Sequence, residues 1–438
     1  MPEKRLSVLF ISPKGDFFSS NPRFQSYLAD SREMRTILHF WNGIGLALPT
    51  LAALTPSHHY VQIVDENYEP VNFDLPCDIV GITSMTQQAA RAYEIADAFR
   101  ERGRHVVIGG IHATVLPSEA RQHCDTVFIG EAETSWPAFL QDFCSGNSRA
   151  VYSQADYPPV LMSNLPIPRY DLLAKYKYPV VFVQTTRGCP HDCEFCVASN
   201  IYGKSYRTKK KAQVLQEIHE AKKHWKWAQI GFADDNMFVS KNYSKSLVAS
   251  FQKMQFTWFA VCDVSIGRDD SLLSDLHASG CRTLLIGFES LSKSNLLTLN
   301  LNSWKAKNLD RYEEYITRIQ RHGIAVYGSF ILGLDLDTSD TVEQMIRFVT
   351  KTNMTGAHAT LLTPFPGSKL RLRLEKENRI LHSNWQMYTL WNAVIKHPLL
   401  STTQLEEGVM RFFTSIFSKE NNQRRIQHFK KICQGLVS

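Results

Sequence analysis

Three cysteines near the middle of the chain have the type and spacing needed to hold a soft metal centre. Cys189, Cys193 and Cys196 follow one another as C-x3-C-x2-C, in a segment that begins at Arg187. Thiolates are the ligands that iron–sulfur clusters, copper(I) and zinc prefer. Because three thiolates on a four-iron cluster leave one iron open to a further ligand, we expect a [4Fe–4S] cluster with one open iron.

Two other interpretations of these cysteines stay open. A structural zinc site needs a fourth ligand, and the neighbouring His191 lies inside the loop rather than at a usual ligand spacing. A disulfide with one free thiol is the other possibility. The remaining six of the nine cysteines stand among apolar residues, which is typical of small core side chains in a reducing compartment. They are Cys77, Cys124, Cys144, Cys262, Cys281 and Cys433.

Further candidate residues stand where predicted strands end, downstream of the cysteines. Taken singly, each has an ordinary explanation as a helix cap, a surface acid, a packing glycine or a plain loop. Their shared place at the strand ends of one domain marks them as candidate site residues. They are Asp234, Asp235, Asn236, Glu289, Gly328, Gly333 and the loop 363–367, which contains Pro364.

A regular alternation of apolar strands and helical segments positions these residues. It runs over residues 179–370, where six strand–helix units predict an incomplete parallel (β/α)6 barrel of the TIM type. The expected strands are 180–185, 229–233, 258–263, 282–287, 325–332 and 358–362.

Residues 1–145 carry a second series, with strands expected at 7–12, 60–65, 78–83, 105–110 and 125–130. This alternation predicts an α/β domain with a doubly wound, Rossmann-like parallel sheet. Ligands of such sheets bind at the carboxyl ends of the strands. The candidate binding residues at those ends are Ser84, Thr86, Gly109, Gly110, Gly130 and Glu131.

Two segments remain. Residues 146–178 are rich in Pro, Ser and Tyr and are predicted to be a linker. Residues 371–438 contain helical patterns at 403–417 and 421–433, which predict a small helical cap over the substrate site. Trp385 and Trp391, in this cap, are more typical of core packing than of a substrate-binding surface.

Length, composition and charge narrow the class of protein. A chain of 438 residues with 44% hydrophobic content fits a soluble protein of two or three domains. Neither a long apolar stretch nor a signal peptide is present, so we expect a cytoplasmic protein without a transmembrane segment. The net charge of +7 lacks the aromatic-interleaved basic stripe of nucleic-acid binders. The basic clusters fit a solvated face, with an anionic substrate or peripheral membrane contact as the alternative.

The cysteine segment resembles the signature of the radical S-adenosylmethionine (AdoMet, SAM) superfamily, C-x3-C-x-Φ-C. The downstream landmarks also follow in the order found in that family. The resemblance implies that the open iron of the cluster binds AdoMet. The residues that it assigns to AdoMet are Phe195 and Pro364 near the adenine, Asp234 and Asp235 near the methionine amine, Glu289 near the ribose or carboxylate, and Gly333 in the fifth-strand motif.

Nearly the whole chain resembles the cobalamin-binding branch of that superfamily, the class B methyltransferase type. The segments 78–84, 109–114, 130–133 and 403–417 carry this resemblance. It implies that the N-terminal candidate residues bind cobalamin.

One departure concerns the lower face of cobalt. The D-x-H-x-x-G motif, whose histidine ligates cobalt from below, is absent from the turn at 12–17. His112 is an alternative ligand, although a lone loop histidine is more typically a hydrogen-bonding residue.

The resemblance implies a C-methyltransferase that acts on an unactivated carbon through a 5′-deoxyadenosyl radical and methylcobalamin. Its cofactors would be a [4Fe–4S] cluster, AdoMet and cobalamin. Its partners would be a small-molecule or lipid substrate and an external one-electron donor of the flavodoxin or ferredoxin type. Ring formation or rearrangement without methyl transfer is one alternative, and a non-catalytic iron–sulfur electron carrier is another. No catalytic residue is assigned.

Overall fold

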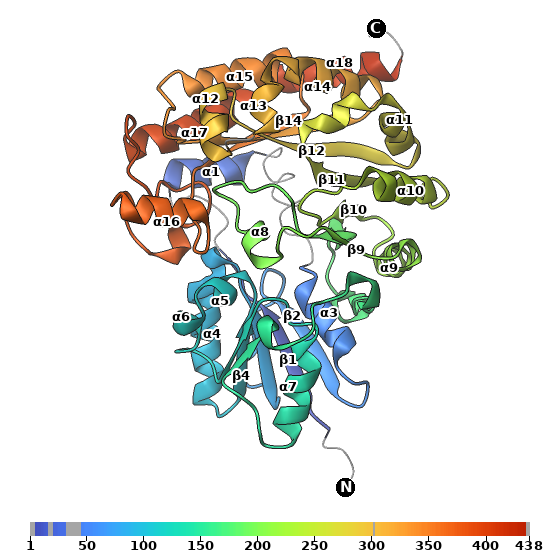
Figure 1. Ribbon diagram of the computed structural model, residues 1–438, viewed down its shortest axis with the longest axis vertical. Coiled ribbons are helices and arrows are strands. Elements are labelled where there is room, and N and C mark those ends of the chain that lie inside the picture. Colours follow the sequence, from blue (N-terminus) through green and yellow to red (C-terminus); the bar gives the residue numbers. More distant parts are fainter. Residues whose placement is uncertain (1–4, 16–20, 32–44, 301–302, 435–438) are drawn as a thin grey trace.

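The computed structural model describes residues 5–15, 21–31, 45–300 and 303–434. Two six-stranded parallel sheets dominate it, the N-terminal one below the other in Figure 1. The strand order of the N-terminal sheet is β2-β1-β3-β4-β5-β6. Its strands are β1 (Ser7–Ser12), β2 (Tyr60–Asp65), β3 (Ile79–Thr83), β4 (His105–Gly109), β5 (Thr126–Ile129) and β6 (Val151–Ser153).

Helices cover both faces of this sheet because successive residues of its buried strands point to opposite sides. On β1, Phe10 packs on Trp136 with ring centroids 5.3 Å apart, whereas Ile11 belongs to a separate core with Ile95. The doubly wound prediction is confirmed. The helices around this sheet are α3 (Ala47–Leu54), α4 (Ala89–Glu101), α5 (Ile111–Val115), α6 (Pro117–Ala120) and α7 (Ser135–Cys144), preceded at α4 by the 3₁₀ turn η1 (Thr86–Gln88).

The predicted linker contains structure that joins the two halves. Its residues 151–153 form β6, which pairs with β5 and extends the first sheet beyond residue 145. A strand of three residues is too short to give a periodic signal. Farther along, the buried Tyr178 donates its hydroxyl to Asp65 at 2.8 Å, and Tyr170 donates to the carbonyl of Phe182 at 2.9 Å.

The second sheet has the order β14-β13-β12-β11-β10-β7. Within the described residues no pairing joins β7 to β14, so the sheet is an open, partial barrel, as predicted. Its strands are β7 (Val180–Val183), β10 (Gln229–Phe232), β11 (Trp258–Cys262), β12 (Cys281–Glu289), β13 (Ala325–Leu332) and β14 (Gly356–Leu361). The main helices outside it are α9 (Lys211–His224), α10 (Lys241–Phe251), α11 (Asp270–Ala278), α14 (Tyr312–Arg321) and α15 (Thr341–Lys351).

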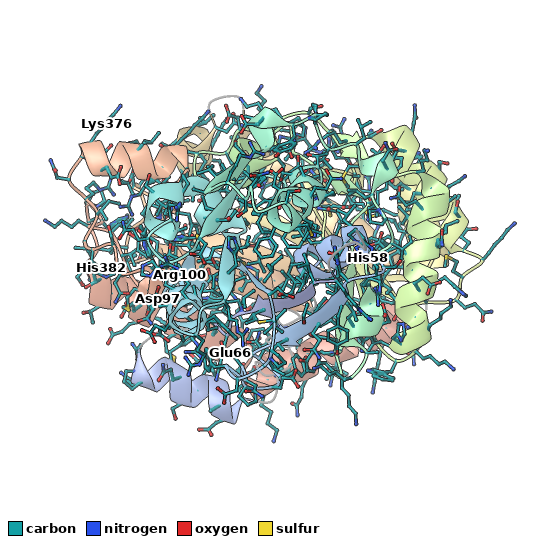
Figure 2. All side chains as sticks on the ribbon, turned by 90° about the horizontal axis from the view of Figure 1, so that it is seen from below. His58, Glu66, Asp97, Arg100, Lys376 and His382 are labelled. Atoms are coloured by element: carbon teal, nitrogen blue, oxygen red, sulfur yellow. The ribbon has the colours of Figure 1, made fainter. Side chains whose placement is uncertain are left out.

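The C-terminal part divides into two pieces. Helix α17 (Thr402–Ile416) packs on β14 and α15, and α18 (Lys419–Cys433) packs on α14 and α17. The 3₁₀ turn η7 (Trp385–Met387) lies instead against α4 and η1 of the N-terminal half. Helix α16 (Lys369–Lys376) packs through Leu370 and Leu374 in a core that also contains Leu334. Figure 2 shows His382 and Lys376 on the same side of the molecule as Asp97 and Arg100 of α4.

Helix α1 (Pro22–Asp30) lies away from the sheet whose first strand precedes it. Its buried Phe24 packs on Phe413 of α17 with ring centroids 5.5 Å apart, and Tyr27 donates its hydroxyl to the Phe413 carbonyl at 3.3 Å. The early residues of the predicted domain 1–145 therefore also contact the far end of the chain. No helix of the described residues is long and apolar enough to cross a membrane.

The scattered cysteines follow their predicted role with one correction. Cys77, Cys124, Cys262 and Cys281 are buried and free. Cys144 is exposed, because it ends α7 on the solvent side, and is not a core side chain. The side chain of the sixth, Cys433, lies outside the described residues.

Candidate functional site

The three predicted metal ligands lie on one loop, between β8 (Thr186–Arg187) and α8 (Ala198–Ile201). Cys189, Cys193 and Cys196 are all partly exposed, and the backbone N–H of Cys196 donates to the carbonyl of Cys193 at 3.1 Å. Burial raises the pKa of the Cys193 thiol to about 12. Burial also raises the pKa of the Cys189 thiol. Without a metal these two thiols hold their protons, and iron would displace the protons, because metal binding favours the thiolate.

The loop fits an iron–sulfur cluster better than a single ion. Among the residues that the structure describes, no three His, Cys, Asp or Glu side chains converge on one point as a metal ion requires. Zinc needs its ligands at about 2.3 Å from one atom. A four-iron cluster instead takes each thiolate on a different iron and tolerates wider spacing. His191 is exposed, which further disfavours it as a fourth zinc ligand.

Gly188 lets the loop turn where it does. Its φ is +91°, in the left-handed region, and a Cβ placed there would lie 2.3 Å from the backbone carbonyl oxygen of Ser205. Any side chain would therefore push the loop away from the segment that closes it. The close approach of the Gly188 and Ser205 backbones therefore requires glycine at the position just before Cys189.

Two predicted acids at the end of β10 hold the base of this loop. Asp234 is buried and accepts the backbone N–H groups of Thr185 at 2.7 Å and Thr186 at 2.8 Å. Asp235 accepts the N–H of Gly188 at 3.2 Å. Burial raises the pKa of Asp234 to about 6. Both acids thus lie beside the cysteine loop and brace it, and their assignment to AdoMet stays a prediction.

Glu289 ends β12 in a left-handed conformation, with φ +63°, where the strand register shifts. Its carboxylate accepts a hydrogen bond of 2.7 Å from Nζ of Lys305, a residue of the short helix α13 (Trp304–Lys307). Both groups are close enough to Cys193 to act on the pKa of its thiol, Lys305 lowering it and Glu289 raising it. Non-glycine residues at positive φ are uncommon, and such strained residues cluster at functional sites. Lys305 was not predicted, because no motif marks it in the sequence.

The residues predicted near the adenine surround one small apolar core. Phe195 packs against a cluster that contains Leu334 and Leu362, and Pro364 is buried in the following loop. Gly333 donates its N–H to Asp337 at 2.8 Å, and burial raises the pKa of that carboxyl to about 6. The fold therefore brings Phe195, Gly333 and Pro364 into one neighbourhood.

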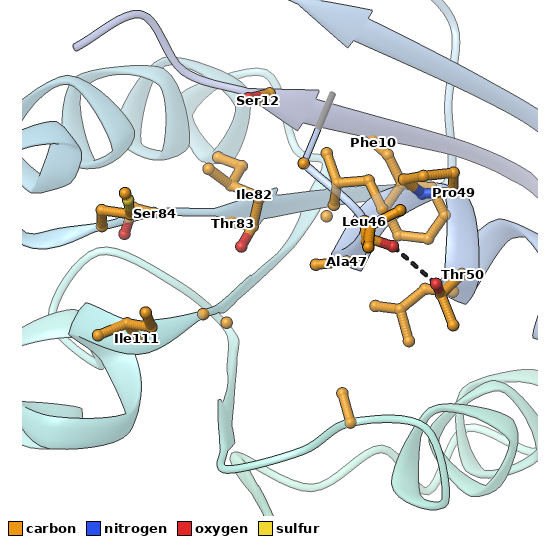
Figure 3. Close-up of a pocket in the computed structure, with 18 of the residues that line it drawn as sticks. Phe10, Ser12, Leu46, Ala47, Pro49, Thr50, Ile82, Thr83, Ser84 and Ile111 are labelled. Carbon is orange, nitrogen blue, oxygen red and sulfur yellow. Dashed lines mark hydrogen bonds between the residues drawn. The ribbon is translucent and has the colours of Figure 1, made fainter. Parts of the chain in front are cut away.

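A cavity of about 530 Å³ lies between the two sheets. Strand ends of the N-terminal sheet form one wall, and Gln184, Arg187 and Ala233 beyond β7 and β10 contribute to the other. Figure 3 shows Ser84 on one side, with Phe10, Leu46 and Pro49 forming an apolar wall on the other. Of the predicted cobalamin-binding residues, five line this cavity, namely Ser84, Gly109, Gly110, Gly130 and Glu131.

Two features of this cavity suit a bulky ligand. The hydroxyl of Ser84 is buried and has no hydrogen-bond partner in the described protein, so it can donate to or accept from a ligand. Gly110 has φ +94°, and a Cβ there would lie 2.9 Å from the backbone N of Ser84. A side chain at Gly110 would push against the backbone of Ser84, which lines the cavity. The small residues at the strand ends and the unpaired Ser84 hydroxyl fit cobalamin.

Thr86 and His112 lie outside the cavity. His112 is fully buried, its Nδ1 lies 3.3 Å from Oγ1 of Thr86, and its Nε2 lies 3.1 Å from a carboxylate oxygen of Glu119. Trp385 donates its indole N–H to the same Glu119 at 2.9 Å. Both ring nitrogens of His112 are therefore engaged within the protein, which agrees with the hydrogen-bonding role favoured from the sequence and disfavours the alternative of a cobalt ligand. Trp385, expected to be core, joins the C-terminal segment to the N-terminal sheet.

A cluster of ion pairs joins the cavity to the cysteine loop. Nη1 of Arg187 contacts the carboxylates of Glu131 and, at 2.8 Å, Glu133. Arg207 of β9 (Arg207–Thr208) contacts the other oxygen of Glu131 at 2.8 Å. Glu131, predicted to bind cobalamin, therefore lines the cavity and also holds two arginines. No pattern in the sequence predicted this pairing, since its partners lie more than fifty residues apart.

Two family models match this chain, one in the barrel domain and one in the N-terminal domain. Residues 183–349 match the family model of the radical SAM superfamily, and residues 70–140 match that of the B12 binding domain. The chain is 29% identical to the bacteriochlorophyllide d C-8(2)-methyltransferase of Chlorobaculum tepidum, over 90% of each chain. It is also 29% identical to the bacteriochlorophyllide d C-12(1)-methyltransferase of the same organism, over 87% of this chain and 84% of that one.

A solved structure shares the fold. The radical S-adenosylmethionine methyltransferase TsrM from Kitasatospora setae, with cobalamin and a [4Fe–4S] cluster bound, superposes with a TM-score of 0.66 at 15% identity. The match covers 96% of this chain and 87% of TsrM. The two-sheet arrangement is therefore the arrangement of that protein.

Proposed function

We propose that this chain, which belongs to the cobalamin-binding branch of the radical SAM superfamily, is a C-methyltransferase that acts on an unactivated carbon. The radical SAM domain implies a [4Fe–4S] cluster and AdoMet, and the B12-binding domain implies cobalamin. The observation that carries the proposal is that residues of both domains line one cavity. Its lining includes both the glycine-rich strand ends and Arg187, two residues before Cys189.

The protein's own residues hold and shield these groups. Cys189, Cys193 and Cys196 would ligate the cluster, and Gly188 and Asp235 keep their loop in place. Ser84 and the backbone at Gly110 would contact cobalamin. When bound, the cluster with AdoMet supplies a 5′-deoxyadenosyl radical that removes a hydrogen atom, and cobalamin supplies the methyl group. The protein contributes orientation and exclusion of water.

The test needs no known substrate. Protein purified without oxygen, with its cluster reconstituted and hydroxocobalamin added, is reduced and given AdoMet with a deuterated methyl group. We expect 5′-deoxyadenosine, and we expect the labelled methyl group on cobalamin together with S-adenosylhomocysteine. Cleavage of AdoMet without methyl transfer would favour ring formation or rearrangement. No cleavage, with the cluster intact, would favour an electron carrier.

The substrate proposal is narrower. Two relatives that match over most of both chains methylate bacteriochlorophyllide d, so this tetrapyrrole is the first substrate to test with labelled AdoMet. Mass spectrometry of the pigment would detect one added methyl group. A lipid or an anionic metabolite is the next class to test, because the C-terminal segment is basic.

The proposal also covers the electron donor of the cluster and the cellular compartment of the protein. The cluster needs an external one-electron donor, and a flavodoxin or ferredoxin fits this need. No disulfide joins the cysteines whose side chains the structure describes, which supports a reducing compartment such as the cytoplasm. Stimulation of AdoMet cleavage by reduced flavodoxin, in place of a chemical reductant, would test the donor.

A further inference from the structure

Arg187 is held by two separate parts of the chain. Its Nη1 contacts Glu131 and Glu133, which follow β5 in the N-terminal sheet, and its Nε and Nη2 donate to the side-chain oxygen of Gln184 at 3.1 and 2.8 Å. The side chains of Arg187, Glu131 and Glu133 are 11%, 9% and 12% exposed. These are buried charges whose partners come from opposite walls of the cavity.

Arg187 directly precedes the cysteine loop in the chain. The two residues after it are Gly188, with its constrained backbone, and Cys189, the first predicted ligand of the cluster. Glu131 directly follows Gly130, which also lines the cavity. A displacement of the glutamates would therefore be transmitted, through a planar guanidinium with fixed geometry, to the start of the cysteine loop.

We propose that Arg187 is a positioning residue that couples cobalamin binding to the order of the cysteine loop. The inference rests on the cofactors of the proposed function, but not on methyl transfer itself. Cobalamin in the cavity would fix Glu131 and Glu133, which then hold Arg187, and a cluster on the loop would fix Arg187 from the other side. Each cofactor then binds more tightly when the other is present, and the effect is reciprocal.

The coupling is measured as a ratio of two dissociation constants. Hydroxocobalamin is titrated without oxygen into the full chain, once without the cluster and once after reconstitution, and bound corrinoid is followed by its absorption spectrum. In the wild-type protein we expect reconstitution to tighten binding by about tenfold, within the usual range of allosteric coupling. In R187M this ratio should fall to about one, because the side chain can no longer join the two walls.

A matched control acts on the same loop from its other end. Arg373 of α16 contacts the carboxylate of Glu194 at 2.6 Å, and Glu194 lies between Cys193 and Cys196. Arg373 does not line the cavity. R373M should loosen the loop and lower the thermal stability of the loaded protein, yet keep the wild-type ratio.

The outcomes separate the coupling from mere stability and from the proposed function. A wild-type ratio of one, or an R187M ratio equal to the wild-type ratio, overturns the inference. If R187M does not fold, R187K decides, since lysine keeps the charge without the planar fork and must still lower the ratio. If the wild-type protein couples its cofactors but moves no methyl group, the proposed reaction fails and the inference stands.

Discussion

The carboxyl ends of the two parallel sheets face one cavity, but their strand ends carry different kinds of residue. The N-terminal sheet makes room: its strand ends carry Gly110 and Gly130, both at positive φ, and the small side chain of Ser84. The barrel instead carries the acids Asp234, Asp235 and Glu289 at its strand ends, outside the cavity lining, and the first two hold the base of the cysteine loop. A large planar cofactor needs strand ends without bulky side chains, whereas the loop that ligates a cluster needs residues that hold its backbone in place. The same topology thus serves two kinds of ligand.

The largest effect that would test this comparison is loss of the cluster. Replacing Cys189 by alanine should abolish the iron–sulfur absorption and lower bound iron from about four atoms per chain to nearly none, since one iron loses its ligand. Chemical iron analysis after reconstitution measures this. C144S is the control, because Cys144 is exposed on α7 and should keep full iron content. Normal iron in C189A would remove the cysteine loop from the proposed site.

The next effect concerns the room that the N-terminal sheet makes. Gly110→Ala places a Cβ 2.9 Å from the Ser84 backbone and adds backbone strain of about 1–3 kcal/mol, because φ +94° with ψ −173° is a conformation that essentially only glycine adopts. We expect hydroxocobalamin affinity to fall by roughly tenfold or more, read by spectral titration.

The control for G110A is Gly103→Ala. Gly103 also has positive φ, +70°, but nothing lies within 4 Å of its Cβ position. G103A should lower stability by a similar amount and leave cobalamin affinity unchanged. Equal losses of affinity in both variants would show that strain, and not space, governs the site.

A pH-dependent effect on stability concerns one carboxyl of the barrel domain, that of Asp337. Burial raises the pKa of Asp337 from 3.8 to about 6. Because the folded-state pKa is raised, protonation stabilises the fold, and this contribution is lost as pH rises from 4 to 7. Two pKa units correspond to about 3 kcal/mol at most. In denaturant unfolding at several pH values, the free energy of unfolding of D337N should therefore increase relative to that of the wild type as pH rises. The exposed control D310N should show no such trend.

The smallest effect is expected at His112. Its ring nitrogens contact Thr86 and Glu119, so it should not ligate cobalt. H112Q should lower thermal stability, since a buried polar contact is disturbed, at a cost of about 1–3 kcal/mol. The electron paramagnetic resonance spectrum of bound cob(II)alamin should not change. A changed spectrum would restore His112 as an axial ligand and contradict the geometry.

Sequence patterns located the elements and their order. The apolar runs that became β1, β3 and β4 are long enough to be recognised, and the spacing of Cys189, Cys193 and Cys196 is specific enough to indicate a cluster. The glycines at strand ends were also recognisable, because left-handed backbone favours glycine. Strand β6, three residues long, fell below what periodicity can detect.

The contacts between distant segments were decided only by the tertiary structure. Nothing local to Arg187 indicates that its partners are Glu131 and Glu133, and nothing near Lys305 indicates Glu289. A charged residue has the same local signal whether it is solvated or paired, because its partner is chosen by how whole sheets pack. Residue types and local spacing thus determined the cluster ligands and the two-domain layout, and the family resemblance implied AdoMet and cobalamin. Only the fold decided how their sites are joined, because that depends on which walls face each other.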